Sequence, residues 1–269
     1  MQLSCIPICL FKELLQDKTL SLQEWINMAT ELGLDGIEMY EPYLASRDEA
    51  YMAKLADSVY GVGLQISMFT SYSDFSSPDI AKREQETAHV KQVVDAAVTF
   101  RTNIVRLTAG SWIDGLSQDE VLQNIAHGLR GCLDYAEEKQ VMLALEDHPV
   151  VGTKISDFVK ILELVDDERL KVNLDTSNPM VSGDNSVDLA KLVAYRVVHL
   201  HASDRLKNLQ HCREGTGEVD FEGVFKVLKS AGYDGWISLE AGGQNGKEDI
   251  RKGIEYIRQV WNEVCVRGI

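Results

Sequence analysis

Short apolar runs alternate with longer amphipathic segments along the whole chain. Eight runs rich in Val, Ile, Leu and aromatic residues have the length and composition of buried strands. They cover residues 4–11, 36–40, 64–69, 103–110, 141–148, 170–178, 197–204 and 236–240. The stretches between them predict helices that return the chain to start the next parallel strand. Two of these helices carry a capping-box signal, because Glu24 follows Ser21 and Glu120 follows Ser117 by three residues.

This order of elements predicts one architecture. A (β/α)₈ barrel contains eight strand–helix units, typically in about 250 residues, and the chain has 269 residues. A doubly wound open sheet shows the same alternation, but no G-x-G-x-x-G motif follows the first run to favour a dinucleotide-binding fold. We therefore expect an α/β fold in which residues 1–269 form a single domain, a (β/α)₈ TIM barrel.

A short motif occurs twice at predicted helix–strand junctions. The segments LGLDGIEM and AGYDGWISLE both contain Gly-x-Asp-Gly before a strand. The first glycine of each, Gly33 or Gly232, is suited to a left-handed helix cap. The second, Gly36 or Gly235, is suited to a tight turn. The repeat supports two loops of the same helix-to-strand type.

Composition and charge narrow the classes of partner. Acidic residues outnumber basic residues by 42 to 27, and the formal net charge is −15. Such a chain would repel a phosphate backbone, so we expect neither nucleic acid nor a membrane surface as a partner. The N-terminus has no basic segment before its apolar residues, and no run reaches the roughly 18 apolar residues of a membrane span. These features predict a soluble, cytoplasmic protein. The five scattered cysteines predict free thiols.

The ends of the last four predicted strands form the candidate site. In a (β/α)₈ barrel the chemistry lies at the carboxyl ends of the strands. The chain places four ionisable residues there: Glu146, Asp175, His201 and Glu240. A single carboxylate at a strand end is more often a helix N-cap. Four such groups at one barrel mouth would repel and desolvate one another unless a cation held them.

The donor set of this group indicates which ion would bind. Three carboxylates and one imidazole suit Mn²⁺, Mg²⁺ or Co²⁺, and Zn²⁺ is a further candidate. Four protein ligands leave coordination positions open for water or substrate oxygens, which is typical of a catalytic site.

The motifs LALEDHP, VNLDTSNP, VVHLHASD, GTGEVDF and GYDGWISLE resemble the successive motifs of the xylose isomerase-like TIM-barrel superfamily. The resemblance covers nearly the whole chain and points to the branch of sugar phosphate isomerases and epimerases that includes ketose 3-epimerases. It implies one divalent metal ion, Mn²⁺ first, held by Glu146, Asp175, His201 and Glu240. His199, deeper on the same strand face, would then support the site or pack in the core.

The same resemblance implies a sugar or sugar phosphate isomerase or epimerase with a small carbohydrate as substrate. The metal would bind the carbonyl and a neighbouring hydroxyl oxygen and stabilise an enediolate. One of the two catalytic glutamates, Glu146 and Glu240, would remove a proton next to the carbonyl while the other returns one from the far face. Related barrels commonly form dimers or tetramers, so a homo-oligomer is also expected.

Four further residues are candidates for substrate binding. His148 lies two positions after Glu146 and is expected either to face the pocket or to support its loop. Asn178 stands where ketose 3-epimerases and endonuclease IV members carry a histidine. Arg106 would point into the barrel, where it needs a partner such as Glu38 unless it contacts substrate. Both roles are open for Arg106 and for Glu38.

Two other stretches bear on the substrate. The segment AGGQNG (241–246) follows the last strand, where barrels often bind phosphate through backbone N–H groups and a helix N-terminus. An ordinary loop is the favoured interpretation, so a sugar is preferred over a sugar phosphate. Five large side chains after the third and fourth strands are expected to line an apolar wall or to pack in the core: Met68, Phe69, Tyr72, Phe75 and Trp112.

Three other functions compete with the isomerase prediction. A metal-dependent dehydratase of the dehydroshikimate or inosose type would use the same ligands and eliminate water. A non-catalytic sugar-binding barrel would bind its ligand without proton transfer. An endonuclease IV-like phosphodiesterase would need more histidines than the six present and a basic surface, which the net charge of −15 disfavours.

Overall fold

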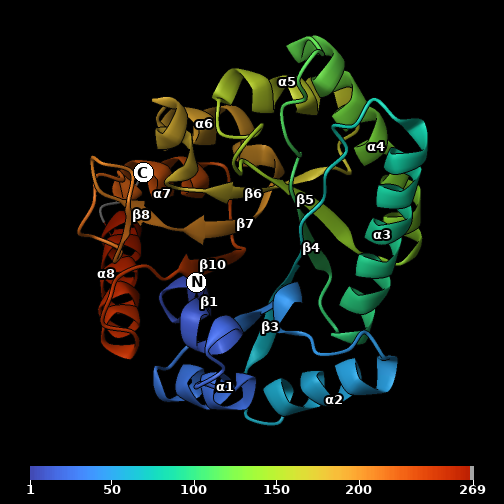
Figure 1. The fold of residues 1–269 in the computed structure, drawn as a ribbon. Helices are drawn as coiled ribbons and strands as arrows, with labels where there is room; N and C mark the ends of the chain where they lie inside the picture. Colours follow the sequence, from blue (N-terminus) through green and yellow to red (C-terminus); the bar gives the residue numbers. More distant parts are fainter. Residues whose placement is uncertain (267–269) are drawn as a thin grey trace.

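Eight parallel strands follow one another around a barrel in the order β1-β10-β7-β6-β5-β4-β3-β2 (Figure 1). The structure, a computed structural model, describes residues 1–266. The strands are β1 (Gln2–Ile6), β2 (Gly36–Tyr40), β3 (Gln65–Thr70), β4 (Ile104–Leu107), β5 (Met142–Glu146), β6 (Lys171–Asp175), β7 (Val197–Ala202) and β10 (Trp236–Glu240). Between β2 and β1, the Asp35 N–H donates to the Leu3 carbonyl over 2.9 Å, which nearly closes the barrel. The predicted TIM barrel is confirmed.

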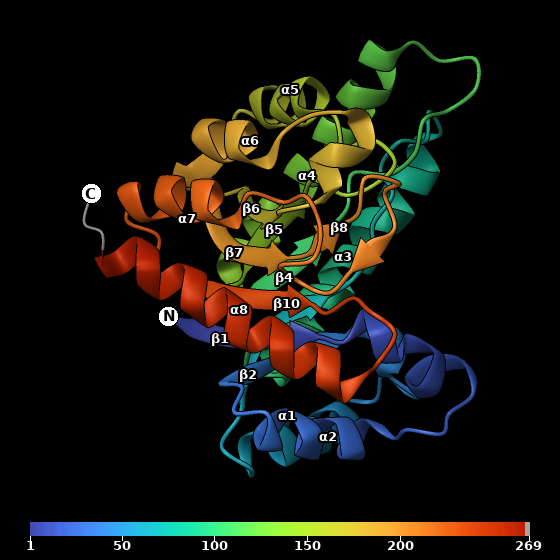
Figure 2. The same ribbon diagram turned by 90° about the vertical axis from the view of Figure 1, so that its left-hand side faces the viewer.

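A helix follows each barrel strand and covers its outer face (Figures 1 and 2). The helices are α1 (Leu22–Glu31), α2 (Glu49–Tyr60), α3 (Ile80–Thr99), α4 (Gln118–Glu138), α5 (Ile155–Val165), α6 (Ser186–Val193), α7 (Phe221–Ser230) and α8 (Lys247–Val266). Both predicted capping boxes are present, since Ser21 and Ser117 accept hydrogen bonds from the N–H groups of Glu24 and Glu120. Within residues 1–266, no helix combines the length and apolar composition that a bilayer crossing requires.

The predicted first strand, 4–11, is too long. Strand β1 ends at Ile6, and a 3₁₀ turn (Ile8–Leu10) and a π-helical turn (Lys12–Gln16) follow. Pro7 explains the early end, because proline has no N–H for the strand ladder. The residues after it therefore form a loop at the carboxyl end of the barrel.

In both Gly-x-Asp-Gly motifs the first glycine has the expected conformation and the second glycine has a different role from the expected one. Gly33 and Gly232 have φ of +70° and +82°, so both adopt the predicted left-handed conformation after a helix. The second glycines serve close packing of strands instead of the expected tight turn. A Cβ on Gly36 would lie 2.6 Å from the Gln65 carbonyl oxygen, and one on Gly235 would lie 2.7 Å from that of Val198.

The inside of the barrel changes from apolar to polar along the strands. Met68, Ile104 and Ala144 form a small buried cluster inside the barrel. Arg106 and Glu146 come two residues later on the same strands, so they share the inward face. The apolar cluster therefore forms the base on which the polar site at the carboxyl ends rests.

A loop between β7 and α7 covers one side of the mouth. It contains the short hairpin β8 (Asp204–Arg205) and β9 (His211–Cys212), which Figure 2 shows beyond the arrowheads of β7 and β10. Glu214 of this loop is fully buried beside Gly253 of α8. Neither of its carboxyl oxygens has a hydrogen bond of normal geometry within residues 1–266. Burial raises its pKa to about 8, because nearby N–H groups such as that of Gly242 offset only part of the desolvation.

We expect Gly36→Ala to lower the free energy of unfolding by about 2 kcal/mol, because the new methyl group overlaps a backbone oxygen that cannot move aside. Gly131→Ala in α4 is the matched control, since its Cβ would meet no atom closer than 3.9 Å. The control should raise stability by about 0.5 to 1 kcal/mol through helix propensity. Urea denaturation measures both, and equal effects of the two substitutions would contradict the packing argument.

The Glu214 carboxyl predicts a pH-dependent stability. Its pKa is about 8 in the folded protein, against an ordinary value of 4.5. Between pH 4.5 and pH 8, unfolding releases a proton from this carboxyl group. The free energy of unfolding therefore falls as pH rises, by roughly 1 kcal/mol per pH unit. Glu214→Gln should therefore gain stability relative to the wild type from pH 5 to pH 8, as measured by denaturation at each pH. Glu218→Gln, at an exposed position of the same loop, should show no such trend.

Candidate metal centre

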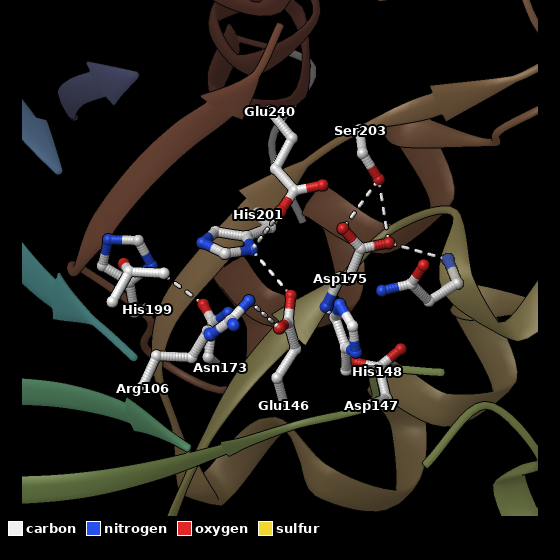
Figure 3. A network of polar contacts seen from close by, with 12 residues as sticks. Arg106, Glu146, Asp147, His148, Asn173, Asp175, His199, His201, Ser203 and Glu240 are labelled. Carbon is white, nitrogen blue, oxygen red and sulfur yellow. Dashed lines mark hydrogen bonds and ion pairs between the residues drawn. The ribbon is translucent and has the colours of Figure 1, made fainter. Parts of the chain in front are cut away.

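The structure brings the four predicted ligands together at the carboxyl ends of β5, β6, β7 and β10 (Figure 3). One side-chain donor atom from each of Glu146, Asp175, His201 and Glu240 lies within 4.8 Å of the others. Three of the side chains are fully buried, and that of Glu240 is 13% exposed. Parallel strands end at one edge of the barrel, which explains why residues from four separate segments meet there.

His201 lies at the centre of the group. Its Nδ1 atom is 2.7 Å from Oε1 of Glu146 and 3.1 Å from Oε1 of Glu240. On the other side of the ring, Nε2 is 3.0 Å from Oε1 of Glu38. Burial alone would lower the pKa of His201, but these three carboxylates raise it well above its ordinary value. The imidazole therefore contacts Glu38 on one side of the ring and the candidate ligands Glu146 and Glu240 on the other.

The end of β6 fixes the orientation of Asp175. Its Oδ1 accepts the N–H groups of Ser177 and Asn178 over 2.8 and 2.7 Å. The Ser203 hydroxyl lies 2.8 and 2.7 Å from the two carboxylate oxygens, and the Asp175 N–H donates to Asp147 Oδ1 over 2.7 Å. Burial and the neighbouring glutamates raise the pKa of Asp175 to about 7. A short 3₁₀ helix (Asn178–Ser182) begins directly after this turn.

The charges of the site fit a divalent cation. Four buried or nearly buried carboxylates, those of Glu38, Glu146, Asp175 and Glu240, lie around His201, and the Arg106 guanidinium pairs with that of Glu146. Buried carboxylates without enough positive charge are costly. Three oxygen donors and one nitrogen donor at this spacing suit a divalent ion that prefers oxygen ligands and accepts one imidazole.

Arg106 pairs with a different acid from the one suggested by the sequence. Its Nη1 donates to Oε2 of Glu146 over 2.7 Å, its Nε donates to the Ser71 carbonyl over 3.2 Å, and its guanidinium lies 4.4 Å from the Tyr72 ring centre. The suggested pairing with Glu38 is wrong. Arg106 is in register with Thr70 and thus with Tyr40, two residues beyond Glu38, so it lies too high in the barrel.

Glu38 and His199 lie beneath the four ligands. Glu38 is fully buried and contacts His201 and the Thr70 hydroxyl. The His199 Nδ1 is 2.8 Å from Oδ1 of Asn173, and its ring meets that of His201 edge-on at 5.5 Å. Burial lowers the pKa of His199 to about 3, so the ring is neutral. His199 thus lies deeper on the same strand face, where the sequence placed it.

His148 and Asn178 lie on the rim. His148 is half-buried, its Nδ1 is 2.7 Å from the Pro149 carbonyl, and its ring lies edge-on to Tyr72 at 5.5 Å. These rings line a pocket of about 410 Å³ beside the mouth. Asn178 is buried, and its Oδ1 accepts from Nη2 of Arg205 over 3.1 Å. Both residues are near the ligands, and Asn178 is also held by a neighbouring arginine.

The expected apolar wall is only partly at the surface. Met68, Phe69 and Phe75 are fully buried in the core, whereas Tyr72 is 44% exposed at the mouth. Trp112 is half-buried against the core. The wall next to the ligands instead includes aromatic residues that the sequence analysis missed: Phe11, Tyr40 and Tyr43. Tyr40 stacks on Phe11 at 5.2 Å and its hydroxyl lies 3.4 Å from that of Tyr72.

Two polar residues of the mouth were also missed. Arg205 contacts Asn178 and the Ser177 hydroxyl. His211 lies close enough to Glu240 for each to shift the pKa of the other. Both residues follow the predicted seventh strand, in the loop that includes the GTGEVDF motif. Loops that cover a barrel mouth often carry residues that bind substrate, so the position of this loop was the signal that could have found them.

Comparison with known proteins gives both sequence and structural relatives. An inosose dehydratase from Clostridium botulinum (strain Eklund 17B / Type B) is 28% identical over 158 residues, 50% of this chain and 53% of the relative. The chain thus spans about half the length of that curated relative. A D-tagatose 3-epimerase-like protein superposes with a TM-score of 0.82 at 20% identity, over 100% of both chains. The IOLI protein with a bound zinc atom superposes with a TM-score of 0.78 at 16% identity, over 100% of this chain and 99% of that one.

A family model covers most of the sequence. The family described as xylose isomerase-like TIM barrel matches residues 26–260. This segment contains all four candidate ligands and every barrel strand except β1. The resemblance carried by the motifs is thereby confirmed. The chain belongs to the xylose isomerase-like TIM barrel family.

Proposed function

We propose that this protein is a divalent-metal-dependent sugar isomerase or epimerase that transfers a proton at the carbon next to a carbonyl. The observation that carries the proposal is the approach of Glu146 and Glu240 to the same His201 nitrogen, at 2.7 and 3.1 Å. Two carboxylates at one ion site, at the open end of a barrel, supply both metal ligands and proton-transfer groups. The epimerase-like structural relative supports the same reaction class.

Glu146, Asp175, His201 and Glu240 would hold the metal, with Mn²⁺ as the first choice and Mg²⁺, Co²⁺ or Zn²⁺ as alternatives. When bound, the ion supplies positive charge that stabilises the enediolate oxygens of the substrate. The zinc atom in the IOLI protein supports a divalent ion in a site of this fold.

The two glutamates are held differently. The Arg106 guanidinium and His201 keep the pKa of Glu146 far below its ordinary value, despite its burial. Within residues 1–266 no arginine forms an ion pair with Glu240, and its side chain is 13% exposed. Arg106 therefore fixes the position of Glu146, while Glu240 faces the side from which substrate enters. Each carboxylate can exchange a proton with a carbon placed between them.

Glu38 is proposed to orient His201. If Nδ1 of His201 binds the metal, the proton of the ring lies on Nε2, which faces Oε1 of Glu38 at an ion-pair distance of 3.0 Å. A carboxylate behind a ligating histidine fixes its tautomer and raises its basicity. Glu38 would then act on the metal site through His201, without touching the substrate.

Contacts to a sugar come from the rim. The exposed Tyr72 ring and the half-buried His148 ring flank the mouth, 5.5 Å apart. Tyr and His present both an apolar ring and a polar atom, which suits the mixed surface of a carbohydrate. Asn178 is buried next to Asp175, and its side-chain oxygen already accepts a hydrogen bond from Arg205.

A dehydratase is the second candidate, because the inosose dehydratase relative matches half of the chain. Such an enzyme begins with the same proton abstraction and then eliminates water. NMR of the products distinguishes the two, since dehydration forms a new C=C bond and epimerisation does not. A non-catalytic sugar-binding barrel is the third candidate, and it predicts ligand binding without exchange of any C–H group.

We expect Glu146→Gln and Glu240→Gln each to reduce incorporation of solvent deuterium into a ketose substrate by at least about 100-fold, because the amide cannot accept the proton. NMR of a panel of ketoses in deuterated water with the metal-loaded protein measures the exchange. Glu137→Gln, on the surface at the end of α4, is the control and should exchange at the wild-type rate. Exchange that persists in both site variants would overturn the proposed mechanism.

We expect Glu38→Gln to weaken metal binding by about 10- to 100-fold, because the Nε2 side of His201 loses its neighbouring negative charge. Competition with a chelator measures the affinity directly, without relying on activity. Glu41→Gln, three residues later at the mouth, is the control and should bind metal as the wild type does. Unchanged affinity in Glu38→Gln would show that Glu38 does not position His201.

A further inference from the structure

A second group of ligand-type atoms lies inside the barrel, on the far side of His201 from Glu146 and Glu240. One donor atom from each of Glu38, His199 and His201 lies within 4.8 Å of the others. All three side chains are fully buried. The metal centre described above uses only His201 of this group, so the other two side chains need an explanation of their own.

The hydrogen bond to Asn173 determines which nitrogen of His199 carries the proton. Nδ1 of His199 lies 2.8 Å from Oδ1 of Asn173 (Figure 3). An amide oxygen only accepts hydrogen bonds, so Nδ1 carries the proton and Nε2 carries a lone pair. This Nε2 atom is buried and has no hydrogen-bond partner within residues 1–266. Histidines that bind metals are usually held in this way, with one nitrogen donating to an oxygen and the other turned to the ion.

Glu38 and His201 approach each other without forming a hydrogen bond of normal geometry. Oε1 of Glu38 and Nε2 of His201 are 3.0 Å apart, yet among residues 1–266 neither atom has a partner at the angles of a hydrogen bond. Two ligand atoms that lie about 2.0 to 2.2 Å from one ion, at right angles to each other, are about 3 Å apart. The Thr70 hydroxyl donates to the other oxygen of Glu38, so Oε1 is the oxygen left for an ion.

Two serine hydroxyls add oxygen atoms to the same part of the interior. Ser4 is in register with Ser238, and Ser238 is in register with His201, so their side chains share the inward face of the barrel. Both serines are fully buried, and in the described part of the chain neither hydroxyl has a hydrogen bond of normal geometry. Buried polar atoms are almost always satisfied in native proteins, by protein, water or an ion. The unsatisfied atoms here indicate a bound species inside the barrel.

We propose that Glu38, His199 and His201 form an inner site that binds a second divalent cation, Zn²⁺. Two imidazoles and one carboxylate are a typical zinc donor set, whereas the oxygen-rich outer site formed by Glu146, Asp175, His201 and Glu240 suits Mn²⁺ or Mg²⁺. His201 would bind the outer ion through Nδ1 and the inner ion through Nε2, and the proton of Nε2 would pass to solvent when the inner ion binds. With the inner site empty, Nε2 keeps its proton beside Glu38. The inner ion goes beyond the proposed function, which needs the outer ion alone.

The charges around His201 favour an ion over a water molecule in the inner site. Four carboxylates surround the ring, and Arg106 with one divalent ion supplies three positive charges against their four negative ones. A second divalent ion that replaces one proton adds one positive charge and balances the count. Water would leave the charge uncompensated in a buried site, which is costly. Because its three ligands are fully buried, the inner ion would hold His201 in place without contacting substrate.

Metal analysis of protein produced with Zn²⁺ and Mn²⁺ and then dialysed against metal-free buffer tests the proposal. The wild type should retain two ions per chain, and His199→Gln should retain one. His127→Gln, at an exposed position of α4, is the matched control and should retain both. An ion content that His199→Gln leaves unchanged would overturn the proposal. Asp175→Asn separates the two sites, since it should lose the outer ion and keep the one that depends on His199. The inner ion can therefore be detected even if the outer site, and with it the proposed function, fails.

X-ray diffraction from the zinc-loaded wild type gives a readout that does not depend on the folding of a variant. Data on the two sides of the zinc absorption edge should show an anomalous peak between Glu38, His199 and His201. Density there without an anomalous signal would identify a buried water molecule and overturn the proposal. An anomalous peak at the outer site alone would overturn it as well.

Discussion

The concentration of buried carboxylates around one imidazole is the constraint on which the rest of this structure depends. Desolvating several acids at one end of a barrel is unfavourable unless positive charge and hydrogen-bond donors surround them. The protein supplies part of that compensation itself, through the Arg106–Glu146 pair at 2.7 Å and the Ser203 hydroxyl on Asp175. The remaining negative charge suits a divalent cation, so the feature that costs stability in the folded chain also forms the candidate ion site.

The residues of the site lie in successive layers along the barrel axis. An apolar cluster closes the interior, Glu38 and His199 lie above it, and the four candidate ligands follow at the strand ends. His201 contacts two of these layers, because its two nitrogens face opposite directions, Nε2 toward Glu38 and Nδ1 toward Glu146. A ring held from both sides has one orientation, which favours a preformed ion site. The rim above is built from loops, where substrate contacts differ most between barrels of one fold.

Carboxylates serve a second purpose in the loops of the mouth. Asp204 and Asp249 accept backbone N–H groups that would otherwise be unsatisfied, and they hold glycine-rich loops in place without a ligand. These internal carboxylates hold the loops through contacts made by the chain itself.

The barrel and the four candidate ligands could be predicted from local patterns in the sequence. Eight apolar runs with helical segments between them specify a parallel barrel, and polar residues at the ends of four runs must then share one mouth. The acid that pairs with Arg106, the contact of Glu38 with His201 and the place of Asp249 inside its loop could be found only in the folded chain. These contacts join residues on strands and loops far apart in sequence. They depend on the stagger of neighbouring strands and on the direction of each side chain, which no local pattern encodes.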